Sequence, residues 1–216
     1  MKAIWYESNG AARDVLIHGE MPTPMPGPGE VLVQLHASGV NPSDWKTRAG
    51  SRPMVSPRVI PHSDGAGVIS AVGEDVDAAR VGERVWIWNG QWKRPFGTAA
   101  EFIALPAAQA VKLPDGISFE EGACFGIAAP RAVLTDGGVA GQSVVVAGAA
   151  GAVGHYAIQF ASAAARADCE AVLAQMMAQV GLIHAIAATL PLGECAAANE
   201  LVQAGTATGN VVLHIP

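Results

Sequence analysis

The sequence predicts an α/β protein whose first half is rich in β-strands. Three observations support this fold class. Short apolar runs separated by Gly and Pro fill residues 1–113, as expected for a series of short strands. The run QSVVVA at residues 142–147 is rich in β-branched residues, as buried parallel strands are. A glycine-rich turn and a long stretch of helix formers follow it, so the second half is predicted to combine strand and helix.

The composition excludes several classes of protein. With 216 residues, 50% of them hydrophobic, the chain can bury a core in one or two domains and is not intrinsically disordered. A net charge of −6 with scattered basic residues argues against a nucleic-acid surface, and no apolar run approaches the length of a membrane span. Cys124, Cys169 and Cys195 are too far apart for a disulfide framework or a CxxC metal site, and the N-terminus has no signal sequence. We therefore expect a reduced, cytoplasmic protein.

The strand candidates of the first half predict a small barrel or a sandwich. They lie at residues 3–6, 15–17, 31–37, 67–72, 84–88, 100–105 and 110–113. The segment MPTPMPGPGE at residues 21–30 must be extended or turning, because each proline fixes its own φ and restrains the residue before it.

Helical patterns dominate after about residue 115. Ser118 followed by Glu120 and Glu121 is typical of a capped helix start, and we expect one or two helices up to residue 137. A long helix is predicted over residues 153–180 and a strand over 182–190. The end of the chain predicts a helix over 194–203, stopped by Gly205, and a closing strand over 210–215.

The glycine turn after the buried strand has the pattern of a dinucleotide site. Glycine lets the backbone approach a pyrophosphate closely, and the following helix offers its unpaired N–H groups to the anion. A plain strand–turn–helix joint, in which glycine only relieves crowding, is the alternative. The candidate cofactor-binding residues are Gly148, Ala149, Ala150, Gly151, Ala152, Val153 and Gly154.

The sequence that follows this turn is too short for a complete dinucleotide-binding fold. Such a fold needs a second strand about 20 residues further on, ending in an acidic or basic residue that contacts the ribose. Residues 155–180 contain good helix formers throughout, and Asp168 and Glu170 lie within this predicted helix and not at the end of a strand. A six-stranded doubly wound sheet needs about 150 residues, and far fewer follow residue 142.

The ordered motifs resemble the medium-chain dehydrogenase/reductase superfamily, in particular its zinc-free quinone oxidoreductase, or zeta-crystallin-like, branch. The resemblance rests on MKAIWYESNG, PGPGEVLVQLHASGVNPSDWKTRAG, IPHSDGAGVISAVGEDV, FGTAAEFIALP, LPDGISFEEGA and VVVAGAAGAVGHYAIQFA, and it resumes in the tail from about residue 170. It implies a GroES-like β-barrel domain, a Rossmann-type domain and NADPH-dependent reduction of quinones or activated alkenes.

The resemblance also predicts how the chain is divided. We expect a catalytic barrel domain over residues 1–117 and a truncated Rossmann-type NADP-binding domain over residues 118–192. A C-terminal helix and strand over residues 193–216 are expected to pack back on the barrel. Family members have several further βα units where this chain joins its tail near residues 162–170. Those units carry most of the adenosine site and the residues that choose NADPH over NADH.

The resemblance allows the zinc positions to be compared residue by residue. Zinc-dependent relatives have a cysteine in the segment GVNPSDWK and a His-Glu pair in HSDGAG. This chain has Asn41 at the first position and Ser63-Asp64 at the second, with His62 adjacent but out of phase. Catalytic zinc needs three N, S or O ligands, so we expect no zinc.

Asn41 is the first catalytic and cofactor-binding candidate, because by resemblance it faces the nicotinamide end of the cleft. An Asx turn before Pro42 is an equally plausible role for it from the local sequence.

Lys46 is a second catalytic candidate, at a position where relatives carry a tyrosine, although a lone lysine is more often only a solvated charge. Asp44 is expected to cap the local backbone. Trp45, Trp88 and Trp92 could stack on a flat substrate but more commonly serve packing.

Two functions therefore remain open. The first is an NADPH-dependent reductase acting on a quinone or enone as a small-molecule substrate, with no nucleic-acid or membrane partner. The second is a non-catalytic remnant in which the barrel serves as a binding or dimerising module. A zinc alcohol dehydrogenase is disfavoured by the ligand positions. Because the strand through which relatives dimerise is missing, we expect a monomer or a non-standard homodimer.

Overall fold

The computed structural model describes residues 1–126, 153–154, 157 and 183–216. The predicted strand at residues 142–147 and the glycine-motif residues Gly148, Ala149, Ala150, Gly151 and Ala152 lie outside this part of the chain. The predicted helix over 153–180 is represented only by residues 153, 154 and 157, which are helical.

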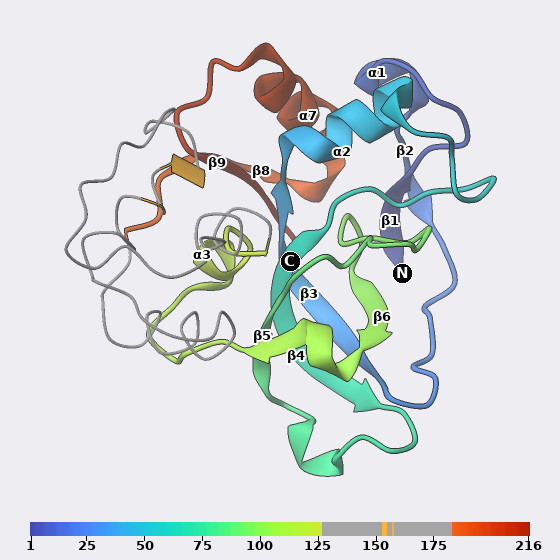
Figure 1. The fold of residues 1–216 in the computed structure, drawn as a ribbon, viewed down its shortest axis with the longest axis vertical. Coiled ribbons are helices and arrows are strands. Elements are labelled where there is room, and N and C mark those ends of the chain that lie inside the picture. Colours follow the sequence, from blue (N-terminus) through green and yellow to red (C-terminus); the bar gives the residue numbers. More distant parts are fainter. Residues whose placement is uncertain (127–152, 155–156, 158–182) are drawn as a thin grey trace, which may run out of the picture.

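The described residues form a strand-dominated structure with short helices on its surface (Figure 1). The strands are β1 (Lys2–Trp5), β2 (Ile17–Glu20), β3 (Glu30–Val40), β4 (Asp64–Val72), β5 (Arg84–Ile87), β6 (Phe102–Pro106), β7 (Ala110–Lys112), β8 (Ile186–Pro191) and β9 (Asn210–His214). The helices are α1 (Ala12–Val15), α2 (Pro42–Lys46), α3 (Phe119–Gly122) and α7 (Cys195–Ala204). Further helical turns are η1 (Thr47–Ser51), η2 (Ala78–Arg80), η3 (Ala107–Gln109) and η4 (Leu192–Glu194).

The long strand β3 organises the main sheet. The strand order is β7-β5-β4-β3-β9-β8, and β6 also pairs with β3. β4 runs antiparallel along most of β3, while the opposite edge of β3 is shared by two partners. Residues 30–34 of β3 pair with β6, and residues 37–40 pair with β9. The C-terminal strand thus completes the edge of β3 that leads into α2.

The strand predictions of the first half are confirmed with one correction. The apolar run at residues 15–17 is not a strand: α1 occupies Ala12–Val15, and β2 begins only at Ile17. The reason is tertiary, because α1 packs beside α7, and Arg13 of α1 pairs with Glu200 of α7 at 2.7 Å. Helix α2 directly after β3 was not predicted from the sequence.

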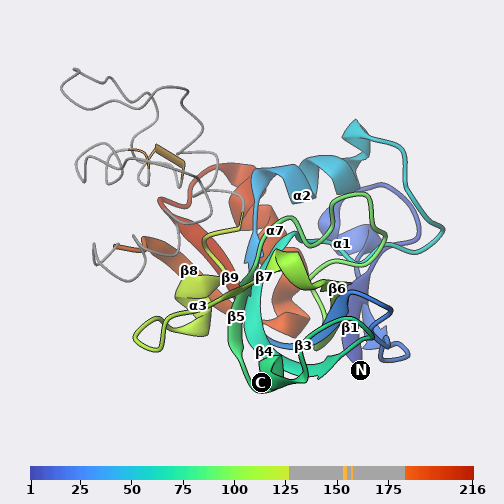
Figure 2. The ribbon, with the colours of Figure 1, turned by 60° about the horizontal axis from the view of Figure 1, so that its bottom comes forward.

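The C-terminal elements share the core of the first half. Cys195, Ala198, Val211, Leu213 and Ile215 belong to the same buried cluster as the inward-facing residues of β1 and of strands β3 to β6. Helix α7 ends as predicted, because Gly205 adopts a left-handed backbone (φ 67°) that favours glycine. Both views place α7 beside α1 and α2 (Figures 1 and 2). Residues 186–216 are therefore an integral part of this sheet and its core.

Within the described residues, no helix has the length and apolar character needed to cross a membrane.

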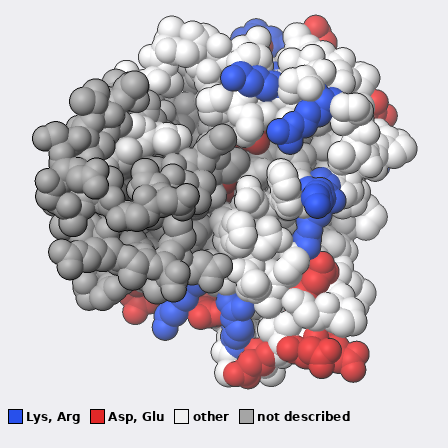
Figure 3. Space-filling view, in the orientation of Figure 1, with Lys and Arg blue, Asp and Glu red and all other residues white. Residues whose placement is uncertain are grey.

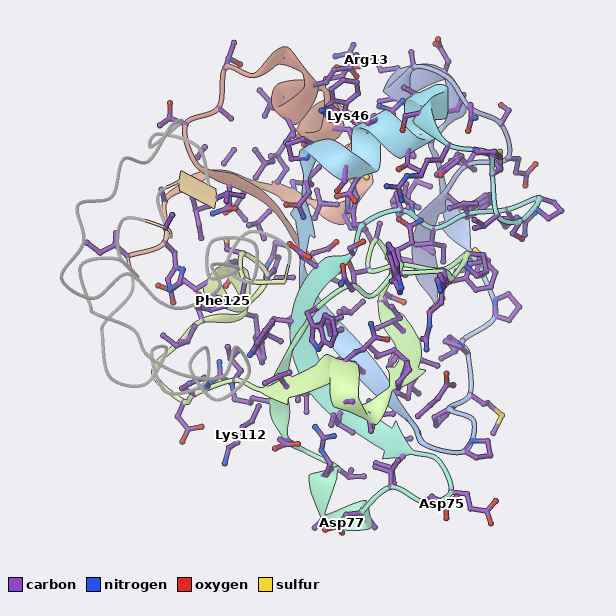
Figure 4. All side chains as sticks on the ribbon, viewed as in Figure 1. Arg13, Lys46, Asp75, Asp77, Lys112 and Phe125 are labelled. Carbon is purple, nitrogen blue, oxygen red and sulfur yellow. The ribbon has the colours of Figure 1, made fainter. Side chains whose placement is uncertain are left out.

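Charge is distributed unevenly over the face of the molecule shown in Figure 3. On the face shown in Figure 3, Lys and Arg side chains are spread among uncharged residues. Acidic side chains gather at the end where the turn after β4 carries the exposed residues Asp75 and Asp77 (Figure 4).

Candidate functional site

Asn41 is the residue at which β3 ends and α2 begins. Its backbone N–H donates to Oδ2 of Asp44 at 2.7 Å. Pro42, which has no N–H to satisfy, is the first residue of the helix. Asp44 therefore closes the first turn of α2 onto Asn41, which is the local capping role that the sequence favours for it. This bond fixes the backbone from which the Asn41 amide projects.

The side chain of Asn41 is held by Asp64, at the start of the neighbouring strand. Nδ2 of Asn41 donates to Oδ2 of Asp64 at 2.8 Å, and the two residues are only 8% and 1% exposed. In the β3–β4 register Gly39 lies opposite Asp64, which brings the start of β4 beside the residues that follow β3. Gly39 permits a close approach of α3, because a Cβ at this position would collide with the carbonyl oxygen of Ala123.

Asp44 is a buried carboxyl group close to its titration midpoint at neutral pH. Burial raises the pKa of Asp44 to about 7, while hydrogen bonds from the Asn41 N–H and the Ser43 side chain act in the opposite direction. Both protonation states are therefore populated near neutrality, and both can bind the Asn41 N–H through an acceptor oxygen.

Lys46 lies at the end of α2, on the surface of the molecule (Figure 4). Its Nζ is 5.7 Å from the ring centroid of Trp45, a distance typical of a cation–π contact. Trp88 donates from Nε1 to the carbonyl oxygen of Ala108 at 3.3 Å, and Trp92 is 57% exposed. The predicted roles of Lys46 and of these tryptophans in substrate binding stay predictions.

A buried chain of hydrogen bonds runs behind the Asn41–Asp64 pair. Nδ1 of His62 lies 3.1 Å from Oγ of Ser38, and Oγ of Ser38 lies 2.8 Å from Oγ1 of Thr98. Thr98 in turn donates to the backbone carbonyl of Asp64 at 2.6 Å. On the other side of the ring, Nδ2 of Asn199 in α7 lies 3.2 Å from Nε2 of His62. This series of hydrogen bonds therefore links the C-terminal helix α7 to the start of β4.

His62 is neutral in this arrangement. Its imidazole is completely buried, and burial, assisted by the positive charge of Arg48, lowers the pKa of His62 to about 3. Asn199 can only donate from Nδ2, so Nε2 of the ring must accept and Nδ1 must carry the proton towards Ser38. His62, which is out of phase with the zinc position of the resembling family, forms this internal link instead.

The two described cysteines are not nucleophiles. Cys195 is buried in α7, and burial raises its pKa to about 12; burial also raises the pKa of Cys124. We expect neither thiol to react with iodoacetamide in the native protein at pH 8, while both react in urea, because the thiolate is the reactive form. Peptide mass spectrometry of the labelled protein measures this, and labelling of native Cys195 would contradict it.

The last two residues of the glycine motif lie within the described part of the chain. Val153 is 40% exposed, Gly154 is buried, and both are helical. A helix at this point agrees with the predicted strand–turn–helix order. Across the described ranges, no group of three His, Cys, Asp or Glu side chains is placed to hold a metal ion.

Comparison with known proteins identifies the class of this fold. Residues 27–115 match the family described as alcohol dehydrogenase GroES-like domain. A mycobacterial structure complexed with NADPH superimposes with a TM-score of 0.84 at 19% identity, covering 100% of both chains. A cobalt- and zinc-bound alcohol dehydrogenase from Pyrobaculum aerophilum gives a TM-score of 0.79 at 20% identity, covering 100% of this chain and 99% of that one. At these identities the two structures show the fold alone.

Sequence similarity identifies the family of this chain more specifically than the fold does. It is 36% identical to human quinone oxidoreductase over 169 residues, which are 76% of this chain and 50% of the human protein. The chain belongs to the medium-chain dehydrogenase/reductase superfamily, as a homologue of its quinone oxidoreductases. It spans about half the length of the curated relatives that it matches.

Proposed function

We propose that this protein is an NADPH-dependent, zinc-free oxidoreductase that reduces a quinone or an activated alkene or carbonyl compound. The observation that carries the proposal is the 36% identity to human quinone oxidoreductase over most of the chain. The site supports it, because a polar residue buried at the end of β3 is held in place by two carboxyl groups.

The residues present fit a nicotinamide dinucleotide. The Asn41 side chain accepts from the Asp44 backbone N–H in the capping box of α2, and the second lone pair of its oxygen can accept a hydrogen bond from a carboxamide. Val153 and Gly154, at the end of the glycine motif, are helical, and in such folds a pyrophosphate is bound where a helix follows the glycine turn. When bound, the cofactor supplies the hydride. In this proposal Asn41 orients the reactants, and the Lys46 ammonium donates a hydrogen bond or a proton to the reduced oxygen.

Zinc independence is part of the proposal. Asn41 and Asp64 occupy two of the positions at which zinc-dependent relatives bind the metal, and here they bind each other. A zinc ion would have to break that buried hydrogen bond, and Asn41 is a poor substitute for the cysteine ligand. We further propose a cytoplasmic protein with a small-molecule substrate, no nucleic-acid or membrane partner, and a monomeric or non-standard dimeric state.

Replacing Asn41 with Ala is expected to lower kcat/KM for NADPH-dependent reduction of a quinone by about 100-fold, the usual cost of removing one oriented polar group from a reacting centre. Assays of NADPH consumption with a panel of quinones and enones measure this loss of kcat/KM. Asn9→Ala, at an exposed position, is the matched control and should leave turnover unchanged. The proposed activity is wrong if the wild-type chain neither consumes NADPH nor binds it by calorimetry.

The second candidate is a binding module without cofactor. It is favoured by the pairing of β9 with β3 and by the packing of α7 into the main core, all within the described residues. This candidate predicts a folded protein whose melting temperature does not respond to NADPH. The reductase predicts a rise instead, since ligand at 100 times its Kd stabilises by about 2.7 kcal/mol.

A further inference from the structure

Arg48, in η1, is a buried cation that the proposed reaction does not use. It is one of the largest fully buried side chains among the described residues. We propose that Arg48 and Asn199 of α7 form an internal water site, in which bound water accepts from Nε and Nη2 of Arg48 and donates to Oδ1 of Asn199. This site goes beyond the proposed function, because it depends on neither cofactor nor substrate.

One end of the Arg48 guanidinium is already bound to the backbone. Nη1 donates to the carbonyl oxygen of Gly10, and the backbone carbonyl of Arg48 accepts from the Gly10 N–H at 3.1 Å. These two bonds join η1 to the loop that precedes α1. They hold the guanidinium at its Nη1 end and leave the edge formed by Nε and Nη2 for another partner.

The second edge of the guanidinium carries donors without a protein partner. Nε and Nη2 of Arg48 are buried, and neither donates to an atom of the described part of the chain. In a planar guanidinium the Nε–H and one N–H of Nη2 point in the same direction, as a fork. Burying a cation with unmatched donors is costly, so we expect an acceptor at this fork.

Asn199 contributes an unmatched acceptor to the same buried cluster. Its Nδ2 lies 3.0 Å from the carbonyl oxygen of Cys195 and 3.2 Å from Nε2 of His62, which uses both of its hydrogens. Its Oδ1 is buried and has no partner among the residues that the structure describes.

The charge of Arg48 acts on the same two residues that Asn199 contacts. Burial lowers the pKa of His62, and the positive charge of Arg48 lowers it further. Burial raises the pKa of Cys195, and the charge of Arg48 opposes that rise. Arg48 therefore lies near both residues, and its unmatched donors belong to one cluster with the unmatched oxygen of Asn199.

The presence of both donors and an acceptor identifies the ligand. A chloride or carboxylate ion can only accept hydrogen bonds, so it would suit the Arg48 fork but leave Oδ1 of Asn199 without a donor. Glu200, the carboxylate that follows Asn199, is held by the exposed Arg13, whose Nε is 2.7 and 2.9 Å from its two oxygens. Water both donates and accepts, and internal water in proteins makes about three hydrogen bonds to buried polar groups. Water is therefore the ligand that satisfies all three atoms.

The test counts internal water molecules. Oxygen-17 magnetic relaxation dispersion detects water that stays inside a protein for longer than the protein takes to tumble. Arg48→Met keeps a side chain of similar length but removes the fork, so it should lose the dispersion amplitude of at least one water molecule. Arg58→Met is the matched control, because Arg58 and its partner Glu7 are exposed, and it should keep the wild-type amplitude. A wild-type amplitude in Arg48→Met would overturn the proposal.

A second readout needs only the wild-type protein, so it decides the question if Arg48→Met does not fold. In 15N-edited spectra, the Nε–H of Arg48 should show cross-peaks to water that have opposite signs in the NOE and ROE experiments, as a long-lived contact does. The Nε–H of Arg58 should show only exchange with bulk water. Absence of the Arg48 cross-peaks would refute the site.

A bound anion is distinguished from water by titration with sodium chloride and with sodium formate. For a water site, the melting temperatures of the wild type and of Arg48→Met should respond to each salt in parallel. A rise confined to the wild type would assign the fork to an anion and overturn the water site. These measurements use no NADPH, so their failure and the failure of the proposed reductase are distinguishable.

Discussion

Replacing His62 with Ala is expected to lower the free energy of unfolding by about 4 kcal/mol. The substitution removes a ring that is completely buried, which leaves a cavity, and it deprives Ser38 and Asn199 of their hydrogen-bond partner. It also cuts the link between α7 and the start of β4. Urea denaturation followed by tryptophan fluorescence measures the loss, and His18→Ala, at an exposed position, should cost less than about 0.5 kcal/mol.

The backbone of His62 offers a sharper control. Its φ of 76° lies in the left-handed region, where alanine and most other residues with a Cβ are strained by about 1 kcal/mol. His62→Gly relieves that strain while losing the same ring, so it should be about 1 kcal/mol less destabilising than His62→Ala. A loss of unfolding free energy below about 1 kcal/mol for His62→Ala would show that the buried hydrogen bonds through His62 contribute little to stability.

The pH dependence of stability is expected to contain two large effects that oppose each other. Burial lowers the pKa of His62 from 6.5 to about 3, so between these values the unfolded chain binds a proton that the folded chain does not. Stability contributed through His62 therefore falls as the pH is lowered through this window. Burial raises the pKa of Asp44 from 3.8 to about 7, so the folded chain keeps a proton that the unfolded chain has lost. Stability contributed through Asp44 falls as the pH is raised from 3.8 to about 7.

Single variants should separate the two effects. Each shift is of the order of 4 kcal/mol, and the two nearly cancel between about pH 4 and 6.5. Asp44→Asn should therefore become less stable as the pH is lowered through this window, and His62→Gln less stable as it is raised. Denaturation curves at half-unit pH steps measure both slopes. Parallel pH profiles for the two variants and the wild type would contradict this assignment.

Local sequence patterns predicted much of the fold because the signals were short in range. The alternation of apolar residues in β3, the Ser118–Glu121 helix start and the glycine after α7 each depend on neighbours within a few residues. Ser118 and Glu121 do form the reciprocal cap that their spacing predicts, with bonds of 3.2 and 2.8 Å. The error at residues 15–17 arose where a distant helix, α7, decides the local conformation.

The candidate site could be predicted only in part. Asn41 was found because it replaces a residue with known chemistry in a resembling family, and the capping role of Asp44 follows from a spacing of three residues. The partners of these residues are distant in the chain. Asp64 is 23 residues from Asn41, and Asn199 is 137 residues from His62. No local pattern encodes such pairs, because only the folded chain brings residues so far apart in sequence into contact.

The sequence by itself therefore determined the class of protein: a β-rich domain of the dehydrogenase/reductase type, with an asparagine where a metal ligand would stand and a glycine motif further along the chain. These features are properties of residue types and their spacing. Only the tertiary structure decided what holds the site together. Strand register brings Asp64 to Asn41, and the return of β9 and α7 to the sheet brings Asn199 to His62. Burial then shifts the proton affinities of Asp44 and His62 in opposite directions, because charge is costly wherever the folded chain excludes water.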